Sequence, residues 1–217
     1  MSGNFVLYGG QGTGAVAVEA ALVLAGQAYE LVDVPDAQTL GRLLPQMRQV
    51  PRLILPDGQA MTESEAILIR LAELLPHAGL APAIDDPARG QFLRWMSFVA
   101  TQVYAHFWLK DDPSRLVPDA SLHSQVSRRI EARITDCWAV MERETTGFAA
   151  AGPWILGQGP TVLDAYVAVV SRFRPRRRRF YAAAPRLGEA VRRLDADPRL
   201  SRLWDERYPF FDGWEDD

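Results

Sequence analysis

The sequence contains a single cysteine, Cys137, among its 217 residues. A disulfide within the chain is therefore impossible, and such low cysteine usage is typical of a protein from the reducing cytosol. Because no cysteine precedes position 137, a C-x-x-C redox motif and cysteine-centred disulfide exchange are excluded from the first half of the chain. Cys137 lies among Ile134, Trp138 and Met141, so we expect it to be a buried core residue.

Histidine and long apolar runs are scarce as well. The three histidines, His77, His106 and His123, stand at unrelated spacings, so we expect no metal site. No apolar run approaches the roughly 18 residues of a membrane span, and the N-terminus, MSGNFVLYGG, lacks the basic start of a secretory signal. A net charge of −3 gives no reason to expect nucleic acid or a membrane as a partner. We therefore expect a cytoplasmic protein that binds neither.

The first part of the chain alternates between strand-like and helix-like patterns of apolar residues. The order β-α-β-α-β-β-α predicts an α/β unit with a mixed sheet. The predicted strands are 5–8, 29–34, 52–55 and 59–61, and the predicted helices are 15–25, 38–46 and 62–75.

The composition changes at residues 76–82, where prolines and a glycine indicate a linker. We place a first domain at 1–76, a linker at 77–88 and a second domain at 89–217. The second domain contains no convincing strand, so the predicted fold class is α/β followed by all-α. Its predicted helices are 91–108, 122–146, 161–173, 185–195 and 198–208.

The stretch YGGQGTGA, residues 8–15, has four glycines within six positions between a predicted strand and a predicted helix. Such a loop indicates that something approaches its backbone closely. The spacing is not G-x-G-x-x-G, and the loop has no lysine for a phosphate-binding loop. We therefore reject nucleotide binding.

Gln49, Val50 and Pro51 precede the third predicted strand. A proline entering a strand removes a ladder hydrogen bond. A cis Val50–Pro51 bond would turn the backbone groups of Val50 outward, so that they could pair with an extended ligand. A trans proline at a strand start is the alternative.

Thr62 and Glu65 have the spacing of a capping box, which predicts the start of a helix. Glu63 and Ser64 would then occupy its first turn, where free N–H groups favour an anion. Ser64 could bind a ligand carboxylate and Glu63 a neighbouring ammonium group. The alternative is that Glu63 only complements the helix dipole.

Together these elements, QVPRLILPDGQAMTESEAILIRLAE at 49–73, resemble the thioredoxin-like N-terminal domain of the cytosolic glutathione transferases, in a bacterial-type member. The resemblance continues through FLRWMSFVATQVY and GPTVLDAYVAVVSR, and so covers nearly the whole chain. It implies an all-helical second domain whose central helix starts with a capping box formed by Thr161 and Asp164.

The resemblance also implies a glutathione site. The backbone of Val50, fixed by Pro51, would pair with the cysteinyl part of glutathione, and Glu63 and Ser64 would hold its γ-glutamyl end. Gln49 would lie near that end or near the glycyl part.

Helix 91–108 would help to line the pocket of the second substrate, with Tyr104 and His106 as candidates, together with Tyr8 from the first domain. Tyr104 stands where related bacterial enzymes can carry a catalytic histidine, and His106 lies elsewhere on the helix. For Trp108 we expect core or dimer packing.

The thiol of glutathione must be activated as a thiolate. Family members supply a Tyr, Ser or Cys near the end of the first strand, whereas Gly14 and Ala15 stand at the usual cysteine and second serine positions here. Thr13 is the loop's only hydroxyl, so we predict it to be the catalytic donor, in preference to Tyr8.

The predicted function is transfer of glutathione, as co-substrate, to a small hydrophobic electrophile, by a chain that the family resemblance implies to be a homodimer. The alternative is a non-catalytic relative that serves as a binding or assembly protein. We interpret the arginine run 174–179 as a solvated connection, and expect the aromatic tail 208–214 to pack back onto the protein, with a flap over the pocket as the alternative.

Overall fold

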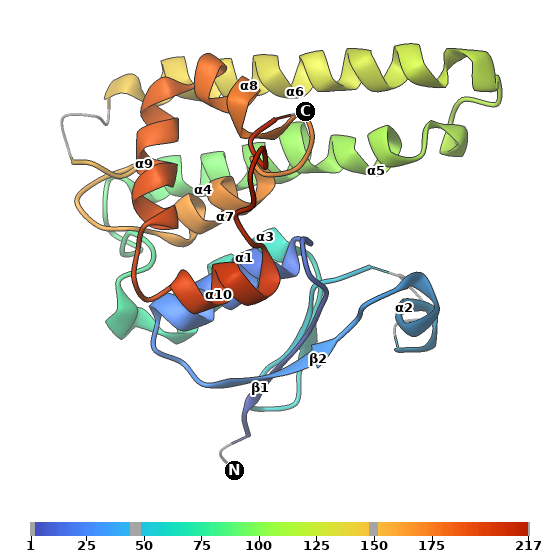
Figure 1. The fold of residues 1–217 in the computed structure, drawn as a ribbon. Coiled ribbons are helices and arrows are strands. Elements are labelled where there is room, and N and C mark those ends of the chain that lie inside the picture. The colour runs from blue at the N-terminus through green and yellow to red at the C-terminus, as the bar shows by residue number, and fades with distance from the viewer. Residues whose placement is uncertain (1–2, 44–48, 148–151, 217) are drawn as a thin grey trace.

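A computed structural model describes residues 3–43, 49–147 and 152–216. A four-stranded sheet lies at one end of the molecule, in the order β2-β1-β3-β4 (Figure 1). β1 pairs in parallel with β2 and antiparallel with β3, and β3 pairs antiparallel with β4. The sheet is therefore mixed, as predicted. Its strands are β1 (Phe5–Gly9), β2 (Tyr29–Asp33), β3 (Arg52–Ile54) and β4 (Ala60–Met61).

Three helices complete the first part of the chain, in the predicted order. They are α1 (Ala15–Leu24), α2 (Ala37–Leu43) and α3 (Ser64–Leu74). α1 and α3 lie between the sheet and the remaining helices (Figure 1), and α1 is buried along almost its whole length. The helix predicted at 38–46 is present up to Leu43, and its last residues lie outside the described ranges.

The rest of the chain is helical, and no strand follows Met61 in the ranges that the structure describes. This confirms the predicted fold class, a thioredoxin-like α/β unit followed by an all-α part. The longer helices are α4 (Arg89–Phe98), α5 (Ala105–Asp111), α6 (His123–Thr145), α7 (Val162–Val170), α8 (Arg176–Ala183), α9 (Pro185–Asp195) and α10 (Ser201–Arg207).

α4 and α5 form one continuous helical segment through a π-helical stretch, η2 (Val99–Tyr104). Wider π turns occur mostly as short insertions in α-helices, often at functional sites. Here the stretch ends at Tyr104, a predicted site residue. Cys137 on α6 is 1% exposed, so its predicted place in the core is confirmed, and burial raises the pKa of its thiol. No helix among the described residues is long and apolar enough to cross a membrane.

The predicted capping box at the start of α7 is confirmed. The Thr161 hydroxyl accepts a hydrogen bond from the Leu163 backbone N–H, and the Asp164 carboxylate accepts one from the Thr161 backbone N–H. The other oxygen of Asp164 accepts from the Ile155 N–H at 3.0 Å, which ties the loop before α7 to the helix start. Asp164 is fully buried, and burial raises the pKa of its carboxyl group.

We expect Asp164→Ala to destabilise the protein by about 2 kcal/mol, because it removes the cap and leaves the Ile155 N–H without its acceptor. Denaturant unfolding would measure the change. Asp205→Ala, at a solvent-exposed position of α10, is the control and should change stability by less than about 0.5 kcal/mol. Equal effects of the two substitutions would contradict the role given to Asp164.

The capping box predicted for Thr62 and Glu65 is wrong. α3 begins at Ser64, with Glu63 as the residue before it, and no side chain caps this end. The Glu65 carboxylate instead accepts a hydrogen bond from the Ser97 hydroxyl on α4, at 2.6 Å. A contact to another helix has therefore replaced the local one.

The arginine run is not a solvated connection throughout, as we had interpreted it. Its last four residues, 176–179, form the start of α8, where Arg177 is fully buried, 2.8 Å from the Asp195 carboxylate. The aromatic tail packs back onto the protein, as expected: the rings of Tyr208, Phe210 and Trp214 surround the Arg172 guanidinium, whose central carbon lies 3.8 to 4.9 Å from their centroids.

Candidate functional site

A cavity of about 1100 Å³ lies between the first part of the chain and the helical part. Its first wall comes from the loop before α1, the segment before β3 and the start of α3. The opposite wall comes from η2 and α5, from the end of α7 and the connection to α8, and from Tyr208. The predicted site residues in the lining are Thr13, Gln49, Val50, Pro51, Glu63, Ser64 and Tyr104.

The segment before β3 presents extended backbone to the cavity. The Val50–Pro51 peptide bond is cis, the first of the two alternatives left open by the sequence. Pro51 is buried, Val50 is partly buried and Gln49 is exposed. The N–H and C=O groups of Val50 make no backbone hydrogen bond within the described residues, so they are free to pair with an extended ligand.

Glu63 and Ser64 meet at the start of α3. Glu63 has a φ of 64°, a left-handed value that is uncommon for a residue with a side chain. Its carboxylate forms no ion pair among the described residues. Ser64 is buried, and its hydroxyl lies 3.0 Å from the Tyr166 hydroxyl of α7. This end of the cavity thus offers a free carboxylate beside the free N–H groups of a helix start.

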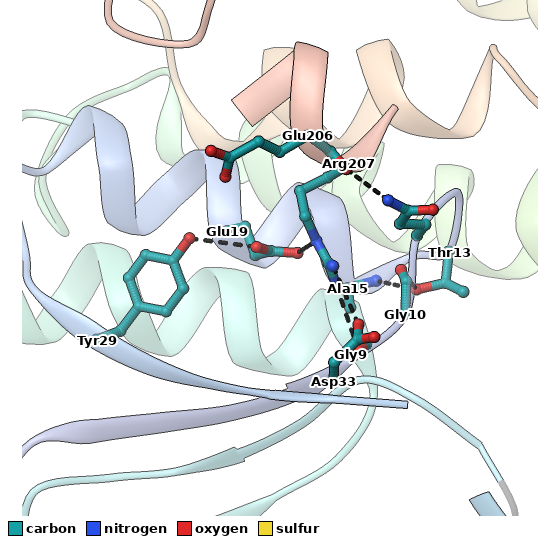
Figure 2. Close-up of polar contacts among 10 residues, drawn as sticks. Gly9, Gly10, Thr13, Ala15, Glu19, Tyr29, Asp33, Glu206 and Arg207 are labelled. Carbon is teal, nitrogen blue, oxygen red and sulfur yellow. Dashed lines mark hydrogen bonds and ion pairs between the residues drawn. The ribbon is translucent and has the colours of Figure 1, made fainter. Parts of the chain in front are cut away.

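The protein's own atoms approach the glycines of the loop between β1 and α1. A Cβ atom at Gly14 would overlap the Tyr104 hydroxyl. Gly12 has a φ of +64°, which glycine adopts without strain. Figure 2 shows Thr13 in this loop: its hydroxyl donates to the Gly10 carbonyl at 2.8 Å and accepts from the Ala15 N–H at 3.3 Å.

The C-terminal helix α10 holds the same loop from the other side. The Gly12 N–H donates to the Arg207 carbonyl at 3.0 Å, and the Gln11 amide donates to the Glu206 carbonyl at 2.7 Å. The Arg207 guanidinium reaches between α1 and the end of β2, where it contacts Glu19 and Asp33, each at 3.0 Å (Figure 2). The position of Thr13 therefore depends on residues nearly 200 positions away.

Tyr104 brings a second hydroxyl to the loop, from η2. Its ring packs against Phe107, Tyr166 and Phe173, with centroids 5.5 to 6.1 Å apart. Burial raises the pKa of its hydroxyl to about 12, against the opposing effect of a hydrogen bond from the Gly14 backbone. The phenol is therefore protonated at neutral pH. No described residue accepts its proton.

Two residues that we predicted to line the substrate pocket, Tyr8 and His106, lie outside this cavity. Tyr8 is paired within the sheet, where the Arg52 guanidinium lies over its ring. His106 is partly buried, and burial, with a smaller effect of Arg133, lowers its pKa. Trp108, for which we had expected core or dimer packing, is 47% exposed and does line the cavity.

Sequence reasoning missed Tyr166, Arg172 and Arg207. Tyr166 and Arg172 lie in the stretch that carries the capping box of α7, and no short-range pattern distinguishes them from other helical residues. The partners of Arg207, Glu19 and Asp33, are far away in sequence. No cluster of three metal-binding side chains is present among the described residues.

No protein-family model matches the chain. It is 28% identical over 175 residues to the uncharacterised GST-like protein YncG of Escherichia coli K12, covering 78% of this chain and 82% of that protein. It is also 28% identical to the glutathione S-transferase GstA of Escherichia coli O157:H7, over 58% of this chain and 57% of that protein.

Solved structures of related proteins superpose on nearly the whole chain. A glutathione transferase homologue from Sulfitobacter, solved with bound glutathione, superposes with a TM-score of 0.79 at 26% identity, covering 95% of this chain and 99% of that one. A glutathione transferase from Methylococcus capsulatus gives 0.75 at 25% identity, covering 94% and 98%. The chain is therefore similar to glutathione S-transferases in sequence and, over nearly its whole length, in fold, which supports a bacterial-type member of the cytosolic family.

Proposed function

We propose that the protein binds glutathione as a thiolate and transfers it to a small electrophile. The observation that carries this proposal is that Val50, Glu63, Ser64 and Thr13 all line one cavity opposite Tyr104. The Val50 backbone suits the cysteinyl peptide group, the N–H groups at the start of α3 suit the γ-glutamyl carboxylate, and Glu63 suits the adjacent ammonium.

In the reaction, the thiol proton leaves to water and the sulfur is held as a thiolate by the hydroxyls that face the loop, Thr13 and Tyr104. A sulfur lone pair then forms a bond to the electrophilic carbon. With an aryl halide as electrophile, the halide leaves with the electrons of the carbon–halogen bond, so the products are a thioether, a halide ion and a proton. The first wall binds the thiol substrate, and the aromatic second wall brings the carbon close.

From the family resemblance we also infer that the protein is a homodimer and that it is located in the cytoplasm. A non-catalytic binding protein is the competing function, because the loop lacks a cysteine or serine and Thr13 already donates its proton to Gly10. Retention on immobilised glutathione, followed by conjugation of chlorodinitrobenzene, separates the two. Retention without conjugation would support the glutathione-binding site but overturn the assignment of the protein as an enzyme.

Glu63→Gly tests the glutathione site directly. We expect glutathione affinity to fall roughly tenfold, because an ammonium partner is lost. We also expect stability to rise by about 1 kcal/mol, since glycine relieves the left-handed backbone at φ 64°. Calorimetric titration with glutathione and denaturant unfolding measure the two quantities.

Two further variants complete this experiment. Glu63→Gln should lower affinity by a similar factor without the gain in stability. Glu73→Gln, in α3 but outside the cavity, is the charge-matched control and should leave affinity unchanged. Unchanged affinity in both Glu63 variants would overturn the assignment of Glu63.

A further inference from the structure

Three arginines line the cavity where α7 ends and α8 begins: Arg172, Arg174 and Arg176. The next three residues are also arginines, but their charges are neutralised. Arg177 pairs with Asp195, Arg178 with Asp216 and Arg179 with Glu131. None of the three arginines of the cavity wall forms an ion pair with a carboxylate in the described part of the chain.

Arg172 is the most buried of them, at 5% exposure. Its Nη2 donates to the Pro209 carbonyl at 3.0 Å, while its Nε and Nη1 have no acceptor in the part of the chain that the structure describes. The rings of Tyr208, Phe210 and Trp214 stabilise the guanidinium through their faces but carry no negative charge. A buried cation of this kind keeps its field, because little water is present to screen it.

Arg174 and Arg176 stand nearer to solvent. Arg174 is exposed and makes no hydrogen bond within the described residues, and among the same residues the Arg176 guanidinium donates only to the Trp214 carbonyl, at 3.4 Å. Their guanidinium groups are therefore available to a ligand. Lys110 and Arg115 also line the cavity, but they lie 3.1 and 3.5 Å from the carboxylates of Asp111 and Asp112.

The aromatic rings of this wall lie beside its unpaired cations. Tyr104, Phe107, Phe173 and Tyr208 line the same cavity as the three arginines. A flat apolar body would pack on the rings, and an acidic substituent on it would meet the guanidinium groups, which bind carboxylates with two parallel hydrogen bonds. Such a site would discriminate strongly against a neutral analogue, since the unpaired cations would remain unpaired.

We propose that the electrophile is itself an acid: an apolar, aromatic molecule whose carboxylate or sulfonate binds Arg174 and Arg176 under the positive field of Arg172. This rests on the proposed transferase function and refines its second substrate. The bond changes are those of the transfer itself, with carbon–sulfur bond formation and loss of the leaving group, and the acid group of the electrophile is unchanged.

The test uses two electrophiles of the same shape, chlorodinitrobenzoate and chlorodinitrobenzamide, with glutathione and the full-length protein. We expect kcat/KM for the benzoate to exceed that for the benzamide by roughly tenfold or more after correction for their uncatalysed rates. In Arg174→Gln/Arg176→Gln this ratio should fall to about one. Arg128→Gln, an exposed arginine of α6 outside the cavity, makes a single-charge change elsewhere and should keep the full ratio.

Other outcomes identify what else the arginines bind. If the double variant raises KM for glutathione and lowers turnover of both electrophiles equally, the arginines bind a carboxylate of glutathione and the proposal is overturned. A ratio near one in the unmodified protein overturns it as well.

If neither electrophile is conjugated, the proposed function fails, and equilibrium binding decides the inference independently. Quenching of tryptophan fluorescence should then show tighter binding of the benzoate than of the benzamide, lost in the double variant. Equal binding of the two probes would overturn the acid-binding site.

Discussion

Arg207→Leu is expected to destabilise the protein by about 3–5 kcal/mol, the cost typical of leaving a buried charge without its partner. Glu19 is 1% exposed, and its carboxylate depends on the Arg207 Nε at 3.0 Å and on the Tyr29 hydroxyl at 3.2 Å. The substitution also removes the contact to Asp33, which is half exposed and contributes less. Denaturant unfolding at neutral pH measures the loss.

The effect of Arg207→Leu should depend on pH with a definite sign. Burial raises the pKa of Glu19 above its ordinary value of 4.5, and Arg207 opposes this rise. Without Arg207 the folded-state pKa rises further, so the folded chain binds a proton that the unfolded chain has already lost. Relative to the unmodified protein, the cost is therefore absent below about pH 4.5, grows as pH rises from the folded-state pKa of Glu19 in the unmodified protein to the higher one in the variant, and is complete above the latter.

The double variant Arg207→Leu/Glu19→Leu is the control, because it removes the stranded carboxylate together with its partner. We expect it to recover a large part of the lost stability. The stability that the double variant still loses should also be nearly independent of pH. If the single and double variants were equally unstable at every pH, the cost would come from packing of α10 and not from the ion pair.

Loss of this ion pair also has a consequence for the site. α10 positions the loop that carries Thr13, through the Gly12 N–H and the Gln11 amide. In a stable background, Arg207→Leu should therefore reduce turnover although Arg207 does not line the cavity. Arg207 acts here as a positioning residue. If turnover recovers together with stability in the double variant, packing of α10 is sufficient to position the loop without Arg207.

The sequence predicted the β-α-β-α-β-β-α order because each of these elements has a local apolar pattern. It also predicted the capping box of Thr161 and Asp164, whose members are three residues apart. The capping box predicted at Thr62 failed because α3 begins at Ser64, directly after Glu63, and Glu65 accepts a hydrogen bond from Ser97 on another helix. Local signals were reliable where no distant residue competed for the same polar groups.

The residues missed by the sequence are those whose partners lie far along the chain. The pair Arg207–Glu19 spans 188 positions, and the Ser64–Tyr166 contact spans 102. The arginine run has no apolar period, so neither α8 nor the burial of Arg177 could be predicted. The division of this run into paired and unpaired arginines depends on which helices surround it, and only the folded structure contains that information.

Tyr104→Phe is expected to reduce kcat/KM roughly 10- to 100-fold, the effect of removing a hydrogen bond to a charged sulfur. The two hydroxyls at the loop differ in whether the protein already uses their protons. Thr13 already donates its proton to the Gly10 carbonyl at 2.8 Å, so it must rotate to serve a thiolate. Tyr104 lies against Gly14 with a proton that no described residue accepts, and its raised pKa, about 12, keeps that proton in place. Thr13→Val should therefore have the smaller effect.

The pKa of the bound thiol distinguishes activation from packing. The pH dependence of kcat/KM, measured with a non-ionising electrophile, should shift to higher pH in Tyr104→Phe, because the thiolate loses a donor that favours the charged form. Phe107→Leu, at a ring that packs on Tyr104, is the matched control for packing and should lower the rate without moving the profile. A larger shift in Thr13→Val than in Tyr104→Phe would return the catalytic role to Thr13 alone, and an unshifted profile in both variants would leave activation to the backbone N–H groups at the start of α1.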